Sequence, residues 1–341
     1  MNTSPPATRV VVATHGHCFD GLCSAVMFTR LLRHLHPGQP LAFTYHACGY
    51  GPGQNGVDPK LLAGDVNSIL DFRFSTSPSL TWYFDHHLSA FPTPEDRATY
   101  ERHVVSTGGA RANATGGNPG RRMFHDDAYS SCTKLIADLG AARFGLDSTP
   151  MAELVRWADM IDSAAFPSAK MAVDRTEPEL RLMTVVEHAG DDAFVTKLAA
   201  RLLEEPLAEV ARSEEITLAY EPLGRGHDAF VTLVGERAKE KDGVVLVDLS
   251  DQIIEVAGKF VTYALFPKST YSVLLSRSKS KCKISIGYNP WSPTARRHNI
   301  AEICERHGGG GHAVVGAISL VADQVDAARA LSLSIVDELS R

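Results

Sequence analysis

The chain has 341 residues, 44% of them hydrophobic, and a formal net charge of −6 at pH 7. This length suffices for two domains with separate cores, and the absence of a basic stripe argues against binding to long duplex DNA. The six cysteines form no CxxC pair, which favours free thiols in a reducing compartment. Because neither a signal-peptide pattern nor a long apolar run is present, we expect a cytoplasmic protein that does not enter the membrane.

Three largely apolar runs in the first quarter of the chain predict buried strands. They cover residues 9–14, 66–72 and 81–84; the first leads into His15, the second contains Asp71 near its end, and the third leads into Asp85. Segments of helical spacing lie between them, one of them ending near residues 61–64. This alternation predicts an α/β fold with a doubly wound parallel sheet, in which ligands bind at the carboxyl ends of the strands. We expect this domain to span residues 1–190.

The middle of the chain is predicted to be mainly helical. Residues 106–122 are rich in glycine and alanine and predict a mobile loop, whereas residues 129–144 and 151–161 have helical patterns. A helical linker is expected over residues 191–224. The segment Gly224-Arg-Gly-His227 is interpreted as a hinge between domains.

A smaller α/β domain is expected over residues 225–341. The expected strands cover residues 229–235, 244–249, 272–276, 283–288 and 313–318, with the third and fourth forming a hairpin. Asn299 is placed to cap a short helix, with Glu302 at capping-box spacing. That helix leads into four glycines and a histidine, which could present backbone N–H groups to an anion or form a flexible loop: Gly308, Gly309, Gly310, Gly311 and His312.

The triplet Asp85-His86-His87 ends the third apolar run and predicts a metal site. Imidazoles bind divalent transition metals, and a carboxylate can bridge two ions or orient a histidine. Adjacent side chains of a strand point to opposite faces, so the two histidines cannot both be ligands without a bend. The alternative is a turn in which Asp85 caps a helix and both histidines are solvated.

Several loops at the same edge of the predicted sheet carry further acids and histidines. Together they offer enough nitrogen and oxygen ligands for two divalent cations about 3.5–4 Å apart, an arrangement that activates water and binds phosphate. The candidate residues are His15, His17, Asp20, Asp71, Asp85, His86, His87, Asp159 and Asp162.

These motifs resemble those of the DHH family of phosphoesterases. Residues 14–21 are similar to the first motif of the family, residues 70–74 to the second, Asp85-His-His87 to the third and residues 162–166 to the fourth. The glycines before His312 resemble the signature of the associated C-terminal substrate-binding domain.

The resemblance implies a role for each matching residue. Six of them would hold two cations, most often Mn²⁺ with Mg²⁺ or Co²⁺ as alternatives: His15, His17, Asp20, Asp71, His86 and Asp162, with Asp159 ranked lower. Asp71 would bridge the cations, His87 would face the phosphate, and Asp85 would orient its neighbours. The 308–312 segment and Arg277 would bind substrate.

Two positions depart from the family pattern. The first motif usually has two aspartates two residues apart, whereas here His17 is read at the first place with Phe19 inserted before Asp20. In the C-terminal domain, Ser285-Ile-Gly287 has glycine where the family has the arginine of a Ser-x-Arg. The possible substitutes for that arginine are Arg277, Arg296 and Arg297.

The resemblance therefore implies a metal-dependent hydrolase of short oligonucleotides or dinucleotides, of the nano-RNase type. Long-strand exonucleases of the family usually carry a further nucleic-acid-binding domain. Alternative functions are an exopolyphosphatase or pyrophosphatase-like hydrolase, a catalytically weakened nucleotide-binding protein, or a structural metalloprotein. The family also makes a homodimer an expectation.

Overall fold

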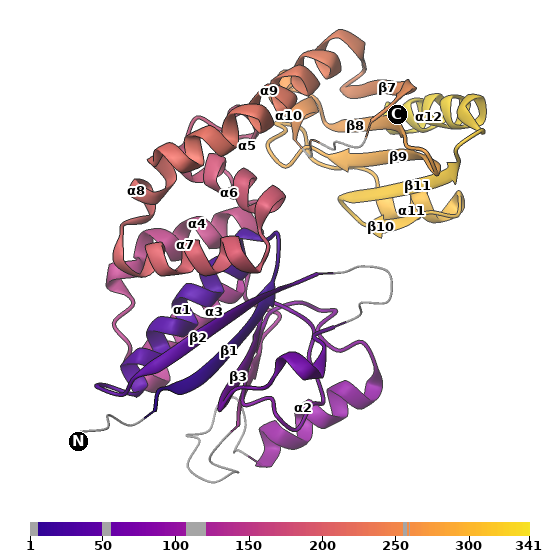
Figure 1. Cartoon of the computed structure of the whole chain (residues 1–341). Helices are drawn as coiled ribbons and strands as arrows, with labels where there is room; N and C mark the ends of the chain where they lie inside the picture. Colours follow the sequence, from indigo (N-terminus) through magenta and orange to yellow (C-terminus); the bar gives the residue numbers. More distant parts are fainter. Residues whose placement is uncertain (1–5, 50–55, 107–120, 255–257, 259) are drawn as a thin grey trace, which may run out of the picture. The chain divides into compact units, whose positions relative to one another are not determined.

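The computed structural model describes residues 6–49, 56–106, 121–254, 258 and 260–341, and the chain divides into two compact units (Figure 1). Unit 1 comprises Met1–Ala165 and Pro178–Tyr220. Unit 2 comprises Phe166–Glu177 and Glu221–Arg341. Within the described residues no helix is both long and apolar enough to cross a membrane.

Unit 1 is built on a five-stranded sheet of order β2-β1-β3-β4-β5, in which every pair of neighbours is parallel. The strands are β1 (Thr8–His15), β2 (Leu41–Cys48), β3 (Val66–Leu70), β4 (Trp82–Asp85) and β5 (Arg122–His125). The expected strands appear as β1, β3 and β4. β2 and β5 were not predicted. β2 lies at an edge of the sheet and only two of its eight residues are buried, and β5 has only four residues.

Helices cover both faces of this sheet (Figure 1), as a doubly wound fold requires. Val10 and Val12 point to the opposite face from Val11 and Ala13, and all four are buried. The face of the sheet that carries Val11 and Ala13 forms an apolar cluster with Tyr100 of helix α2 (Pro94–Ser106). The helices of unit 1 are α1 (Phe19–Leu35), α2 (Pro94–Ser106), α3 (Cys132–Phe144), α4 (Ala152–Asp162), α6 (Pro178–Ala189), α7 (Asp192–Glu204), α8 (Leu207–Arg212) and the start of α9 (Glu214–Arg237).

Two further predictions near this sheet concern a helix and a loop. The helix expected to end near residues 61–64 is a single 3₁₀ turn, Pro59–Leu61, capped by the carboxylate of Asp58. The loop expected over residues 106–122 lies mostly outside the described residues.

Unit 2 contains a six-stranded mixed sheet of order β10-β11-β9-β8-β7-β6, in which β7 and β8 are parallel and the other pairs antiparallel. The expected hairpin is confirmed as β8 and β9. The strands are β6 (Ala238–Lys241), β7 (Val244–Ile253), β8 (Tyr271–Arg277), β9 (Lys281–Tyr288), β10 (Gly310–His312) and β11 (Val315–Val321), and the helices are α5 (Ala169–Asp174), α10 (Val261–Leu265), α11 (Ile300–Arg306) and α12 (Val325–Leu339).

The expected hinge at residues 224–227 and the expected strand at residues 229–235 are both wrong, because these residues belong to α9. Phe230 and Val234 lie one helical turn apart and pack with Val245 and Val247 of β7 in one buried cluster. The β-branched residues of this segment favour a strand locally, and tertiary packing overrides that preference.

The segment Phe166–Glu177, expected in the first domain, packs in unit 2. The indole N–H of Trp291 donates to the Phe166 carbonyl at 2.8 Å, and Nε2 of His227 lies 2.7 Å from the Val173 carbonyl. Val173 also joins the cluster beneath α9. Trp291 is therefore held in a packed turn.

Candidate metal centre

Three neighbouring strands of unit 1, β1, β3 and β4, end beside one another and carry the central residues of the site. His15 is the last residue of β1, Asp71 follows β3, and Asp85 is the last residue of β4. Asp71 has a left-handed backbone (φ 54°), and its N–H donates to the Phe84 carbonyl at 2.9 Å. A Cβ on Gly21 would lie 2.2 Å from the His15 carbonyl oxygen, so glycine is needed for α1 to begin this close to β1.

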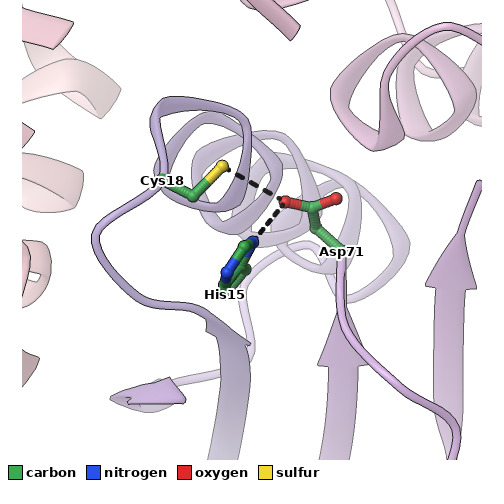
Figure 2. Close-up of side chains that lie close together, drawn as sticks. All are labelled: His15, Cys18 and Asp71. Atoms are coloured by element: carbon green, nitrogen blue, oxygen red, sulfur yellow. Dashed lines mark hydrogen bonds and ion pairs between the residues drawn. The ribbon is translucent and has the colours of Figure 1, made fainter. Parts of the chain in front are cut away.

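The carboxylate of Asp71 lies at the centre of the site and faces two groups of donors. Its Oδ2 lies 3.8 Å from His15 Nδ1 and 3.6 Å from Cys18 Sγ (Figure 2). Its Oδ1 lies 3.5 Å from His86 Nε2 and 3.6 Å from His87 Nδ1. The side chain is 1% exposed, and burial raises its pKa.

His86 presents Nε2 to the carboxylates. Its Nδ1 lies 3.1 Å from the Tyr129 carbonyl, which can only accept, so Nδ1 carries a proton and Nε2 is the nitrogen that could bind a cation. Nε2 lies 3.2 Å from Asp162 Oδ2. Burial disfavours charge on this ring, but the carboxylates of Asp162 and Asp71 outweigh it and raise the His86 pKa to about 11.

The carboxylate of Asp85 is hydrogen-bonded to the ring of His87. Its Oδ1 accepts from His87 Nδ1 at 2.8 Å, and its Oδ2 accepts the hydroxyl of Tyr83 at 3.0 Å. The bond to Asp85 is the main cause of a raised His87 pKa. Asp85 is fully buried and the side chain of His86 is 10% exposed, so the alternative of a helix cap beside two solvated histidines does not describe this structure.

Asp20 has a double role. Its two carboxylate oxygens accept the backbone N–H groups of Cys132 and Thr133, at 2.7 and 3.1 Å, at the N-terminus of α3. Ligand atoms of Asp20, His86 and Asp162 nevertheless lie within 4.8 Å of one another. Burial, followed by the charges of Asp71 and Asp162, raises the Asp20 pKa well above its usual range.

Asp159 is held by different partners. Its Oδ1 accepts the hydroxyls of Ser130 and Ser131 at 2.6 and 3.1 Å, which ties α4 to the turn before α3. It belongs to none of the clusters of possible ligands found among the described residues. This arrangement agrees with its lower rank than Asp162.

The structure does not bring His17 into the cluster. His17 is exposed, its Nδ1 lies 3.2 Å from the Glu187 carbonyl, and its N–H donates to the Gly190 carbonyl. Cys18 occupies the expected place beside Asp71 instead. Cys18 was not among the residues predicted for the site, although its position two residues before Asp20 matches the spacing of the two aspartates in the first motif of the DHH family, with no insertion.

The donor set suits divalent cations. Three groups have ligand atoms within 4.8 Å of one another: His15, Cys18 and Asp71; Asp71, His86 and His87; and Asp20, His86 and Asp162. Two buried atoms that point into the cluster, Asp71 Oδ1 and His86 Nε2, face each other at 3.5 Å, but neither is in the geometry of a hydrogen bond. Such atoms are costly to bury unless something binds them, and imidazole with carboxylate is a suitable ligand set for a divalent transition metal.

The glycine run of unit 2 differs from the expected anion cradle. The N–H groups of Gly308 and Gly309 donate to the Glu305 and Cys304 carbonyls at 3.1 and 2.8 Å, so they close α11 and are not available to an anion. The last glycines belong to β10, which pairs with β11. A Cβ on Gly309 would lie 2.3 Å from the Ala317 carbonyl oxygen, so close packing explains glycine there. His312 is exposed.

The glycine that replaces the arginine of the family also has a packing cause. A Cβ on Gly287 would lie 2.2 Å from the Tyr263 hydroxyl, so an arginine side chain does not fit. Of the possible substitutes, Arg296 and Arg297 donate to backbone carbonyls. Arg277, at the end of β8, makes no side-chain hydrogen bond or ion pair within the described ranges.

No family model and no curated protein sequence matches this chain. The α/β fold expected from the sequence is confirmed by comparison with one solved structure. The chain is similar to the pGpG-specific phosphodiesterase PggH from Vibrio cholerae, with a TM-score of 0.64 and 17% identity over 97% of this chain and 99% of that one.

Two further structures are similar at lower scores. An exopolyphosphatase-related protein from Bacteroides fragilis has a TM-score of 0.49 and 14% identity, over 99% of this chain and 95% of that one. RecJ in complex with Mn²⁺ from Thermus thermophilus has a TM-score of 0.48 and 13% identity, over 97% of this chain and 52% of that one. The fold assignment rests on PggH.

Proposed function

We propose that the chain is a metal-dependent phosphoesterase that uses two divalent cations, preferentially Mn²⁺, to hydrolyse phosphate ester bonds in short oligonucleotides or dinucleotides. The observation that carries this proposal is the buried Asp71 carboxylate, whose two oxygens face separate groups of donors. A similar fold in a protein described as a pGpG-specific phosphodiesterase supports the substrate class.

The electrostatics of the site favour cations over a bare phosphate. Three buried carboxylates, of Asp20, Asp71 and Asp85, converge here with that of the exposed Asp162, and they would repel an anionic substrate. A pair of divalent cations lowers the pKa of a bound water and offsets the charge of a phosphoryl group. Asp71 would hold both cations, and His86 would offer Nε2 to one of them.

His87 is the residue best placed to act on the substrate. Asp85 accepts its Nδ1–H and so fixes the ring, which leaves Nε2 to donate to a phosphoryl oxygen or to the departing oxygen when the imidazole is protonated. The raised pKa of His87 favours that protonated form. A fixed donor of this kind stabilises negative charge that develops on the phosphoryl group.

The test is hydrolysis by the purified full-length protein with Mn²⁺. The substrates are a linear dinucleotide, bis-p-nitrophenyl phosphate, pyrophosphate and polyphosphate. We expect turnover of the dinucleotide that EDTA abolishes, that Mn²⁺ restores and that Asp71→Ala removes. Hydrolysis of pyrophosphate or polyphosphate alone would overturn the substrate class, and binding without turnover of any substrate would overturn the proposal of an enzyme.

A further inference from the structure

Cys18 stands where the chain turns from β1 into α1, and its thiol is directed at the cluster. Sγ lies 3.6 Å from Asp71 Oδ2, which lies 3.8 Å from His15 Nδ1 (Figure 2). The ligand atoms of these three side chains lie within 4.8 Å of one another. The thiol therefore occupies a position from which it could share a cation with both neighbours.

We propose that Cys18 is a metal ligand and that, with His15 and Asp71, it gives one cation position a mixed sulfur, nitrogen and oxygen donor set. This inference rests on the proposed function, since it concerns the same centre. The arrangement of Asp71, which is 1% exposed, supports it: Oδ2 faces both Cys18 and His15, while Oδ1, which is in no hydrogen bond, faces His86 and His87 on the other side. The Asp71 carboxylate is thus placed to bind a cation together with the thiol of Cys18.

The other cysteines with a defined partner in unit 1 behave differently. Cys48 and Cys132 direct their thiols at the backbone carbonyls of His46 and Phe84, at 3.8 and 3.3 Å. Such contacts are typical of cysteines that pack as small apolar residues. Cys18 is directed at a carboxylate, and a cation that binds there would displace the thiol proton.

A thiolate changes which ions the centre prefers. Carboxylates and water suit Mn²⁺ and Mg²⁺, whereas thiolates favour softer ions such as Zn²⁺. With Cys18 as a ligand, the centre should bind Zn²⁺ and Co²⁺ more tightly, relative to Mn²⁺, than the same centre with an aspartate at position 18. We expect Cys18→Asp to lower the ratio of Zn²⁺ to Mn²⁺ affinity by roughly tenfold or more.

The experiment is absorption spectroscopy of the full-length protein loaded with Co²⁺, with bound metal quantified in each sample. We expect a thiolate-to-cobalt charge-transfer band in the near ultraviolet that is lost in both Cys18→Ser and Cys18→Asp. The matched control is Cys48→Ser, which removes a thiol at the end of the neighbouring strand β2 and should keep the band.

The outcomes distinguish a failure of the proposed role of Cys18 from a failure of the proposed metal centre. Stoichiometric Co²⁺ binding without the band, or a band that persists in Cys18→Ser, overturns the role of Cys18 and leaves the proposed function standing. An unchanged ratio of Zn²⁺ to Mn²⁺ affinity in Cys18→Asp also overturns it. A native protein that binds none of the three ions overturns both proposals.

Discussion

Replacement of Asp71 by asparagine tests the centre by measuring metal affinity. The amide keeps the size of the carboxylate but removes its charge and one of the two oxygens that face the donor groups. Because Asp71 would contribute to both cation positions, we expect Mn²⁺ affinity to fall by roughly 100-fold or more, at least the upper end of what substitution of a residue that only supports a ligand costs.

This loss can be converted to stability. At a Mn²⁺ concentration 100 times the Kd, binding stabilises the native protein by about 2.7 kcal/mol, and a 100-fold loss of affinity leaves about 0.4 kcal/mol. For a unit of this size the Mn²⁺-induced rise in Tm should fall from about 5–11 °C to about 1–2 °C. The metal-free variant should be no less stable than the metal-free native protein, because burial raises the Asp71 pKa and so disfavours its ionised form in the folded state.

The assay is thermal unfolding of both proteins with EDTA and across a Mn²⁺ titration. Asp65→Asn is the matched control, since Asp65 precedes the same strand β3 but is exposed and pairs only with Arg9 among the described residues. It should keep the full Mn²⁺-dependent rise in Tm. A full rise in Asp71→Asn would refute the central role of Asp71.

Four further substitutions, one of them a control, have defined outcomes. Asp85→Asn should lower kcat by roughly 10–100-fold with little change in Mn²⁺ affinity, because it weakens the hydrogen bond that fixes the His87 ring and removes no proposed ligand. An unchanged kcat in steady-state assays would contradict this. Gly21→Ala should destabilise the protein by about 1–3 kcal/mol in urea unfolding, because the added Cβ meets the His15 carbonyl oxygen. The control is Gly226→Ala, in open space on α9, which should stabilise the protein by about 0.5–1 kcal/mol. Equal effects of the two substitutions would argue against the close contact at the start of α1. Gly287→Arg should destabilise unit 2 by about 1–3 kcal/mol in calorimetry, and a native-like Tm would show that the tyrosine beside it can move away.

The sequence was sufficient to predict the parts of the fold with strong local patterns. Strands β1 and β4 are largely apolar and β3 ends in Ile69 and Leu70, because both faces of a parallel sheet are covered. Residues 224–235 were misread, since glycines resemble a hinge and a short apolar run resembles a strand. The helix there depends on contacts of Phe230 and Val234 with β7, which lies later in the chain.

The residues of the candidate site also divide into those that local patterns predict and those that depend on the three-dimensional structure. Asp71, Asp85 and His86 could be placed from the sequence because each follows a recognisable strand. The choice between His17 and Cys18 depends on the left-handed backbone of His17 (φ 54°), which turns that residue toward the end of α6. No local pattern encodes this turn. The interval of two residues between Cys18 and Asp20 was the available signal.

The assignment of Phe166–Glu177 to unit 2 has a consequence for the order of folding during synthesis. The chain passes between the units three times, so neither unit corresponds to one continuous stretch. As translation proceeds, this segment emerges before Pro178–Tyr220, which completes unit 1, and well before Trp291, to which it bonds. Its apolar residues, among them Phe166 and Val173, must therefore stay unpaired with their native partners while unit 1 completes. A nascent chain halted near Tyr220 should accordingly be more open to chaperone binding or proteolysis in this segment than the finished protein.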